Sequence, residues 1–426
     1  MADRQNPILP GSYLGILGGG QLGRMFTHAA QAMGYKVCVL DPDEHSPAGI
    51  VADKHIQASY TDSAALKEMA AICQAASTEF ENVPAKALDE LESLGVFVAP
   101  RSAGVSIAQD RVAEKKFLAT WQKEAGIGPA PYQVIEKQSD AEAVSADLFP
   151  GILKTARMGY DGKGQVTVHD RDELVKAWNS FGEVVCVLEK RMDLAFEVSA
   201  LVVRGHDDEV VAYPIAQNIH KNGILHTTTV PAPSINPAQE AKIIDAAKEI
   251  IRRLDYVGVL CVEFFVLKNG EVVANEIAPR PHNSGHYTQN ACLTSQFEQQ
   301  VRAMARLPLG STELIGPSIM LNILGDEWLV SGKKAEPSWE KILKAPSAKR
   351  RLNRLGIRNA TLKASVSALA PNVEAISSSR TKPVMRDTKV KLETIEADLN
   401  KDTATSVARQ RFPLQSTALL TTSTDT

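Results

Sequence analysis

Two acidic residues in an otherwise apolar hairpin are the first residues in this sequence whose types and spacing suggest chemistry. The segment Gly258–Val266 reads as a buried strand that carries Glu263. After a Lys-Asn-Gly turn, the strand Glu271–Ile277 carries Asn275 and Glu276. Carboxylates on strands that otherwise bury apolar side chains need a cation to offset their charge. Carboxylate and amide oxygens suit Mg²⁺ or Mn²⁺, and Mg²⁺ held by two carboxylates usually also holds substrate phosphates. The alternative is an ordinary hairpin with solvated acids.

The loop after this hairpin is rich in cationic and imidazole groups. Residues 278–286 read Ala-Pro-Arg-Pro-His-Asn-Ser-Gly-His. The two prolines fix the backbone angle φ and stiffen the loop. The loop therefore supplies one fixed cation, Arg280, and two imidazoles, His282 and His286, directly after the predicted metal ligands.

A glycine pattern near the N-terminus is typical of nucleotide binding. A strand at residues 13–17 leads into Gly-Gly-Gly-Gln-Leu-Gly at 18–23. A helical segment follows, and a second strand at 36–40 ends at Asp41. This order matches the dinucleotide fingerprint. Free N–H groups at a helix start would donate hydrogen bonds to any phosphate or carboxylate. A tight turn without a ligand also explains the glycines.

A second glycine-rich loop lies between two predicted strands in the middle of the chain. The strand 149–154 ends at Lys154, and the loop Gly-Tyr-Asp-Gly-Lys-Gly-Gln at 159–165 contains Lys163. Such a loop with two lysines reads as a flexible phosphate cover. It is no Walker loop, because no Gly-Lys-Ser/Thr follows and no helix begins there. A solvated hairpin turn is the alternative.

The segments that must position these residues form α/β units. Residues 10–110 read as one doubly wound unit, and its strand end at Thr78–Pro84 carries Glu79 and Glu81, at the edge where open α/β sheets bind ligands. Further predicted elements are strands at 184–189, 197–204, 210–216 and 316–324, and helices at 238–254 and 297–307.

Composition bounds the class of protein. The 426 residues allow two to four domains, and no run of eighteen apolar residues predicts a membrane span. The first residues lack the pattern of a signal peptide. The five cysteines lie far apart, with no Cys-x-x-Cys pair, and read as core residues. These features predict a reducing, cytoplasmic location.

The charge distribution changes near residue 330. The whole chain has a formal net charge of -3, yet residues 331–426 hold 18 Lys+Arg against 9 Asp+Glu. Only two of the 27 glycines, Gly332 and Gly356, lie in this part. We expect weak or absent tertiary structure there.

Taken in order, these motifs resemble the ATP-grasp superfamily. The spellings GGGQLGRM, TEFENV, GYDGKGQ, NIHKNGIL and NEIAPRPHNSGH within residues 11–330 are similar to those of the carboxyaminoimidazole ribonucleotide synthetases. The resemblance implies an α/β fold of three domains: a doubly wound α/β substrate unit at 1–112, a small α+β lid at 113–195 and a central α+β sheet domain at 196–330. An atypical tail at 331–426 lacks the basic Arg-Lys-Met-Gly-His ending typical of the family.

The resemblance also implies roles for individual residues. ATP would contact Arg111, Lys154, Gly159, Tyr160, Asp161, Gly162, Lys163, Gly164, Gln165, Glu189, Glu197, His220, Asn275 and Glu276. The ribonucleotide would contact Gly20, Gln21, Leu22, Glu79, Tyr160 and Asp161. Glu263 and Glu276 would hold Mg²⁺, and the catalytic residues would be Arg280, His282, Asn283 and Lys154.

The implied reaction is ATP-dependent carboxylation of aminoimidazole ribonucleotide by bicarbonate through carboxyphosphate, in purine biosynthesis. The expected partners are these three small molecules and a second copy of the chain, with no nucleic acid and no membrane. Two enzyme alternatives stay open: a formate-dependent purine transformylase, which is another ATP-grasp ligase, and an NAD-dependent oxidoreductase argued from the first glycine pattern alone. The third alternative is no enzyme: a nucleotide-binding or scaffold protein without activity.

Overall fold

The N-terminal unit is a five-stranded parallel sheet with helices on both faces. The computed structural model describes residues 6–157 and 164–323 and, beyond these, only the backbone of four short strands. The strands of the first sheet, in spatial order, are β3 (Lys54–Ile56), β2 (Lys36–Leu40), β1 (Tyr13–Leu17), β4 (Cys73–Thr78) and β5 (Phe97–Val98). Its helices are α1 (Gln21–Ala32), α2 (Ser63–Ile72), α3 (Ala85–Ser93) and α4 (Ser102–Ala108). Because helices cover both faces, the last four residues of β1 and of β2 are buried without alternation.

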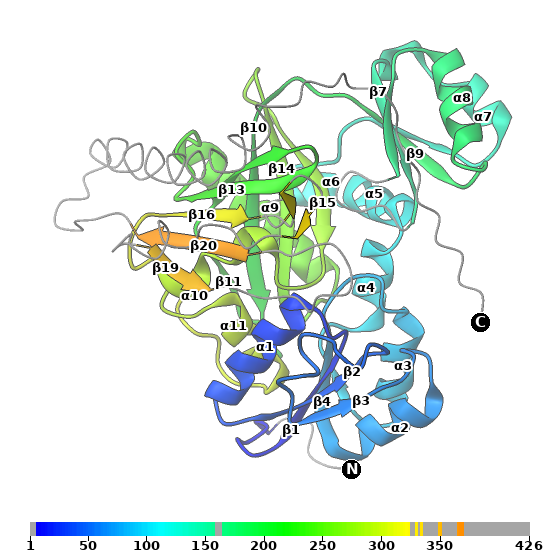
Figure 1. Ribbon diagram of the computed structural model, residues 1–426. Coiled ribbons are helices and arrows are strands. Elements are labelled where there is room, and N and C mark those ends of the chain that lie inside the picture. The colour runs from blue at the N-terminus through cyan, green and yellow to red at the C-terminus, as the bar shows by residue number, and fades with distance from the viewer. Residues whose placement is uncertain are drawn as a thin grey trace.

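The lid is a small antiparallel sheet that stands apart from the N-terminal unit, at the upper right of Figure 1. Its strands, in spatial order, are β6 (Tyr132–Ile135), β9 (Cys186–Lys190), β7 (Gly151–Thr155) and β8 (Gln165–Val168). Its helices are α7 (Gln138–Glu142), η1 (Ala146–Leu148) and α8 (Arg171–Ser180). Leu153 of β7 packs into the lid core with Trp178, and alternation turns Ile152 and Lys154 to the opposite face. That face lines the cavity described below.

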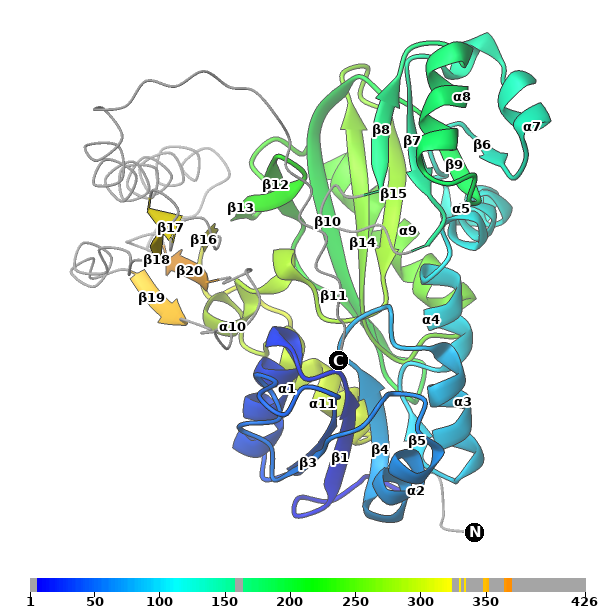
Figure 2. The ribbon, with the colours of Figure 1, turned by 45° about the vertical axis from the view of Figure 1, so that its right-hand side comes forward.

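The central unit is an antiparallel sheet whose long strands run up the middle of the molecule (Figure 2). Its strands, in spatial order, are β15 (Val272–Ala278), β14 (Gly258–Leu267), β10 (Leu194–Arg204), β12 (Ala216–Lys221), β13 (Ile224–Val230), β16 (Ser318–Ile323), β20 (Ala364–Leu369) and β19 (Ala348–Arg351), with β11 (Val210–Ala212) beside β10. Helices α9 (Pro237–Arg253), η2 (Asn283–Gly285), α10 (Thr288–Ala291) and α11 (Gln296–Met304) complete the unit. A separate hairpin joins β17 (Leu329–Val330) to β18 (Lys333–Lys334).

Two helical segments tie the units together. Helices α5 (Arg111–Thr120) and α6 (Gln122–Ala125) connect the N-terminal unit to the lid, and Asp110 caps α5 by accepting from the Val112 N–H at 2.9 Å. Helix α11 follows the central hairpin in sequence, yet Phe297 and Val301 pack into the core of the N-terminal unit with Phe26 of α1. The N-terminal and central units therefore share one hydrophobic cluster.

The predicted three-part α/β architecture is confirmed. One predicted strand, 210–216, is wrong in extent: β11 ends at Ala212, and Ala216 begins β12. Pro214 lies between them, and proline has no N–H to donate to a strand ladder. All five cysteines are buried and free, as expected. None of the helices in the described part of the chain combines the length and apolar character needed to cross a membrane.

Residues 331–426, for which we predicted weak or absent tertiary structure, lie mostly outside the described residues. Within this range the structure describes β18, β19 and β20, and β20 pairs with β16 from Ser318↔Leu369 to Ile323↔Ala364. For the rest of the tail, and for the domain limits 1–112, 113–195, 196–330 and 331–426, the statements above stay predictions.

Candidate active site

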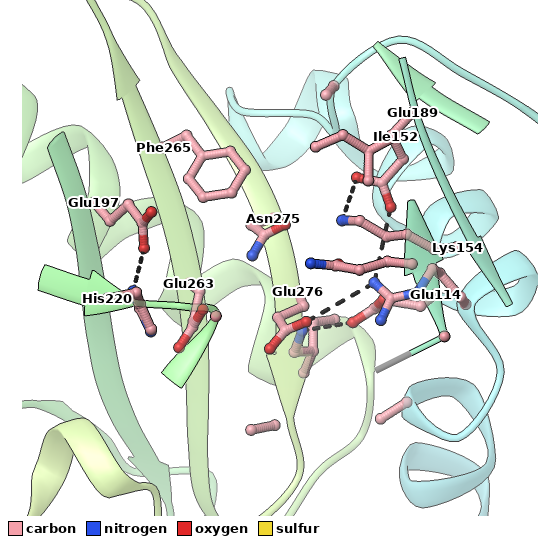
Figure 3. Close-up of a pocket in the computed structure, with 18 of the residues that line it drawn as sticks. Glu114, Ile152, Lys154, Glu189, Glu197, His220, Glu263, Phe265, Asn275 and Glu276 are labelled. Carbon is pink, nitrogen blue, oxygen red and sulfur yellow. Dashed lines mark hydrogen bonds and ion pairs between the residues drawn. The ribbon is translucent and has the colours of Figure 1, made fainter. Parts of the chain in front are cut away.

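A cavity of about 630 Å³ lies between the lid sheet, helix α5 and the central sheet. Figure 3 shows side chains from all three converging on it. The sequence predicted thirteen of its lining residues: Arg111, Lys154, Gly164, Gln165, Glu189, Glu197, His220, Glu263, Asn275, Glu276, Arg280, His282 and Asn283. Residues far apart in the chain thus meet in one place.

Three cations surround one buried carboxylate on the lid side. Lys154 Nζ lies 3.0 Å and Lys115 Nζ 3.3 Å from Glu189 Oε2, and Arg111 lies 3.8 Å from Glu189 Oε1. Burial alone would raise the pKa of the Glu189 carboxyl, but the three cations outweigh it and lower that pKa to about 2. Glu189 therefore stays ionised and holds the cations in place.

This cation cluster has further hydrogen-bond donors and positive charge with which to bind an anion. The buried Nε and Nη1 of Arg111 have no hydrogen-bond partner among the described residues. Burial is the largest influence on the Lys154 ammonium and lowers its pKa. Arg111 also lies 3.8 Å from Glu276, so the three cations face two carboxylates. The cluster therefore has the donors and the charge to receive phosphate groups.

The opposite wall holds a carboxylate–histidine pair. His220 Nδ1 on β12 lies 2.5 Å from Glu197 Oε2 on β10, as the dashed line in Figure 3 shows. Burial lowers the pKa of His220, but the hydrogen bond and the charge of Glu197 outweigh it and raise that pKa. Phe265 on the central sheet and Ile152 on the lid supply apolar surface to the same cavity.

The two predicted metal ligands face each other across the central hairpin. Glu263 of β14 and Glu276 of β15 are direct cross-strand partners. The register then shifts by one residue, so that Phe264 pairs with Ala274 and Asn275 is the extra residue of a β-bulge. The bulge explains why Asn275 and Glu276, although neighbours in sequence, both line the cavity.

This pair fits a divalent cation. Burial and the charge of Glu276 raise the pKa of Glu263 to about 8, although Arg111 lies 3.8 Å from Glu276. Within the part of the chain that the structure describes, the buried Asn275 Oδ1 also has no hydrogen-bond partner. In the described ranges, no three His, Cys, Asp or Glu side chains are grouped to hold a metal by themselves. Glu263 and Glu276 therefore supply part of an oxygen ligand set that substrate phosphates can complete.

Helix α5 fixes the backbone that carries these ligands. β15 is the edge strand of the central sheet, so its outward N–H and C=O groups face no further strand of that sheet at this point. The buried Lys115 donates to Asn275 O at 2.6 Å, and Glu114 accepts from the Ile277 N–H. The side chains of Lys115 and Glu114, here called the α5 clamp, thus hold the backbone on both sides of Glu276.

The predicted cation of the proline-stiffened loop is anchored by the N-terminal unit. Arg280 Nε lies 2.5 Å from Glu81 Oε2, and a second nitrogen lies 3.4 Å from the other carboxylate oxygen. Burial alone would raise the pKa of Glu81, but Arg280 outweighs it and lowers that pKa to about 2. The pair fixes the direction of the guanidinium and connects the first sheet to the cavity.

The N-terminal glycine loop has its amide groups already occupied. The N–H groups of Gly20 and Leu22 donate to the buried Glu79 carboxylate, the second at 2.9 Å. The Gly19 N–H donates to Asp41 at 2.7 Å. A Cβ atom on Gly20 would lie 2.4 Å from Glu79 Oε1, so this approach requires glycine. Glu79 and Asp41 therefore accept hydrogen bonds from the loop.

The predicted ribonucleotide residues therefore divide into two groups. Gly20, Gln21, Leu22 and Glu79 lie together on the N-terminal unit but do not line the cavity. Tyr160 and Asp161 lie outside the described residues, as do Gly159, Gly162 and Lys163, which were predicted to contact ATP. Their assigned roles stay predictions.

Several lining residues were absent from the sequence prediction. Glu114, Gln109, Ile152 and Phe265 line the cavity. Burial raises the pKa of Glu114 to about 7. Glu114 and Lys115 directly follow the predicted Arg111 by one helical turn, and this spacing was the available signal.

The fold and the cavity define the class of protein. The ATP-grasp domain family matches residues 120–297, which hold the lid, α6 and most of the central unit. The ribonucleotide synthetase preATP-grasp domain family matches residues 12–109, the N-terminal unit. The chain is thus built as an ATP-grasp ligase.

The relatives identify the family within this class. The N5-carboxyaminoimidazole ribonucleotide synthase of Brucella melitensis is 45% identical over 325 residues, covering 75% of this chain and 88% of the relative. The protein of that name from Bacillus subtilis is 42% identical over 321 residues, covering 75% and 83%. The chain belongs to the N5-carboxyaminoimidazole ribonucleotide synthase family.

Solved structures agree with this assignment. The Staphylococcus aureus N5-carboxyaminoimidazole synthetase complexed with ADP matches with a TM-score of 0.79 at 34% identity, covering 91% of this chain and 98% of that one. The Aspergillus clavatus enzyme in complex with ADP and 5-aminoimidazole ribonucleotide matches with a TM-score of 0.79 at 27% identity, covering 92% and 99%. The resemblance seen in the motifs is confirmed, and the oxidoreductase alternative is set aside.

Proposed function

We propose that this chain uses ATP and bicarbonate to carboxylate the exocyclic amine of aminoimidazole ribonucleotide. The products are N5-carboxyaminoimidazole ribonucleotide, ADP and phosphate, within purine biosynthesis. The observation that carries the proposal is one cavity in which three cations on one side face a carboxylate pair on the other. Family membership supports the substrate class.

ATP binding is assigned to the cleft between lid and central sheet. The base would lie between Ile152 and Phe265, two of the apolar side chains that line this cavity (Figure 3). The phosphates would meet Arg111 and Lys154, whose charge is held in place by Glu189. Phosphoryl transfer depends mainly on positioning and charge neutralisation, and these residues supply both.

The residues proposed to hold Mg²⁺ are Glu263 and Glu276, with Asn275 close to the phosphates. When bound, the metal neutralises charge on the phosphate oxygens. The buried Glu263 and the partly exposed Glu276 provide negative charge at a place where they otherwise repel each other. The two strands and the α5 clamp keep that pair at a fixed separation.

Arg280, His282 and Asn283 are proposed to hold bicarbonate and the carboxyphosphate formed from it. In the first step, a bicarbonate oxygen attacks the γ-phosphorus and ADP leaves. In the second, the ribonucleotide amine attacks the carboxyl carbon and phosphate leaves, carrying the electrons of the broken C–O bond. Carboxyphosphate must be kept from water, which a glycine-rich lid loop at 159–165 would do.

A homodimer in the cytoplasm is the proposed state of the protein.

The test is a coupled assay of ADP release with each substrate omitted in turn. We expect full turnover only with ATP, bicarbonate and aminoimidazole ribonucleotide together. Formate in place of bicarbonate, with glycinamide ribonucleotide as acceptor, tests the transformylase alternative and should give no product. Turnover with formate and none with bicarbonate would overturn the proposal.

A further inference from the structure

A chain of buried hydroxyl and amide groups runs through the central sheet to the ring of His282. It consists of Thr228 on β13, Asn218 on β12, Ser199 on β10 and Ser284 in η2, here called the relay. Its four members are almost completely buried. Figure 2 shows β13, β12 and β10 side by side, and Asn218 and Thr228 are cross-strand partners. The assigned roles above use none of these four residues.

Each link of the relay donates in the direction of the histidine. Thr228 Oγ1 donates to Asn218 Oδ1 at 3.0 Å, and Asn218 Nδ2 donates to Ser199 Oγ at 2.9 Å. Ser199 Oγ then donates to Ser284 Oγ at 2.8 Å. A hydroxyl has one proton to give. Because Ser284 Oγ accepts the hydrogen bond from Ser199, its own hydroxyl is available to donate to His282 Nδ1, which lies 2.8 Å away. Cys261 Sγ, at 3.8 Å from Ser284 Oγ, is only a weak competing acceptor.

A second donor to the same ring nitrogen cannot change its role. The backbone N–H of Ser284 points at His282 Nδ1 at 3.3 Å, because His282 is the N-cap of η2. A backbone N–H can donate but never accept. Two donors therefore converge on Nδ1, and a proton on that nitrogen would face both of them.

The main chain of His282 is clamped as well. The buried Gln296 side chain accepts from the His282 N–H at 2.8 Å and donates to the His282 carbonyl at 2.8 Å. This amide fixes the peptide groups on both sides of the ring. The ring therefore cannot leave the relay by a simple turn of the backbone.

We infer that the relay holds neutral His282 as the tautomer with its proton on Nε2, so that the ring offers the cavity a hydrogen-bond donor and no base. The Nε2 atom lies on the cavity side, 3.6 Å from Glu263 Oε1. A neutral donor at this place can bind an oxygen of a bound anion without adding to the charge of Arg280. It cannot accept a proton from bicarbonate or from the ribonucleotide amine. Ser284, Ser199, Asn218 and Thr228 are positioning residues that act through His282.

The first test is the tautomer itself, read from the ¹⁵N chemical shifts of the ring. The full chain is labelled with ¹⁵N-histidine and studied at one mildly alkaline pH, and the His282 signals are assigned by their loss in His282→Gln. We expect a pyridine-type Nδ1 and a pyrrole-type Nε2. A pyrrole-type Nδ1 overturns the inference, whatever the enzymatic activity is.

The second test removes single relay groups and uses a matched control. Ser199→Ala deletes the hydroxyl that donates to Ser284. Ser318→Ala deletes an equally buried hydroxyl of the same sheet that has no hydrogen-bond partner in residues 6–157 and 164–323. Ser199→Ala should shift the His282 nitrogens toward averaged values and lower kcat by about twofold to tenfold, the effect of one hydrogen bond. The KM for ATP should stay unchanged. Ser318→Ala should change neither the shifts nor kcat.

A second pair of variants keeps the inference testable if Ser199→Ala does not fold. Thr228→Val keeps the shape but removes the donor, and Thr228→Ser keeps the donor. We expect the valine variant to behave like Ser199→Ala and the serine variant like the wild type. A fall in kcat with unchanged ring shifts would show a packing role and contradict the relay. The kinetic readout rests on the proposed function, but the spectrum does not, so failure of one is distinguishable from failure of the other.

Discussion

At the scale of single residues, the site is a set of charges that are each compensated by a named neighbour. Glu189 is balanced by the cation cluster and Glu81 by Arg280, whereas Glu263 and Glu276 face each other. This difference in environment separates the carboxylates. The first two have a pKa lowered to about 2, and Glu263 has one raised to about 8. Arg111 offsets the charge of Glu276 at 3.8 Å, a longer contact than the 3.0 Å from Lys154 to Glu189. The Glu263–Glu276 pair is therefore the place where a cation gains most.

The first prediction concerns this pair. Glu276→Gln removes one negative charge but keeps the size of the side chain. We expect turnover to fall by about 100-fold to 1,000-fold, as when a key electrostatic group is lost, with the fold intact by circular dichroism. Glu271→Gln, on an exposed position of the same hairpin, is the control. Wild-type ATPase of Glu276→Gln at low Mg²⁺ would show that the metal assignment is wrong.

The second prediction concerns pH and the Glu81–Arg280 pair. The pKa of Glu81 is lowered from 4.5 to about 2 in the folded protein. The pair therefore stabilises the fold above about pH 4.5 and loses this contribution as pH falls towards 2. The unfolding free energy of Glu81→Gln should lie below that of the wild type near neutral pH, and the gap should narrow on acidification. Urea titrations measure it, with the exposed Glu44→Gln as the charge control. A gap that widens in acid contradicts the pairing.

At the scale of elements, helix α5 and strand β15 work as one unit. The bulge at Asn275 turns two adjacent side chains into the cavity, and the α5 clamp holds the backbone on either side of Glu276. The hairpin and its acids were predictable from apolar strands joined by a Lys-Asn-Gly turn. The bulge was not, because register depends on contacts with a helix more than 150 residues earlier.

The third prediction tests this clamp. Lys115→Met leaves the Asn275 carbonyl without its donor and Glu189 with one cation fewer. We expect the unfolding free energy to fall by roughly 1–3 kcal/mol, the cost of an unsatisfied buried group, and the KM for ATP to rise. Lys116→Met changes the exposed neighbouring residue of the same helix and should do neither. Unchanged ATP affinity in Lys115→Met would limit the clamp to a role in stability.

At the scale of the whole molecule, local sequence patterns predicted the three units. The strands and helices of each unit have their own apolar periodicity and are bounded by turn residues. They also predicted that Lys154, Glu189 and the hairpin acids meet, through the resemblance to a family. They could not predict that Glu79 and Asp41 would occupy the amides of the glycine loop. A glycine pattern indicates that an anion can approach the backbone N–H groups of the loop. A carboxylate of the same chain can take that place as well as a phosphate.

The central claim is that bicarbonate is activated by ATP as carboxyphosphate before the carboxyl group reaches the ribonucleotide amine. The direct measurement uses ¹⁸O-labelled bicarbonate with ATP and aminoimidazole ribonucleotide, quenched while bicarbonate still carries its label. In this account a bicarbonate oxygen becomes the bridge to phosphorus and leaves with it, so the released phosphate should contain one ¹⁸O atom. Product formation with phosphate free of label would contradict the account, because ATP would then be cleaved by water and not by bicarbonate.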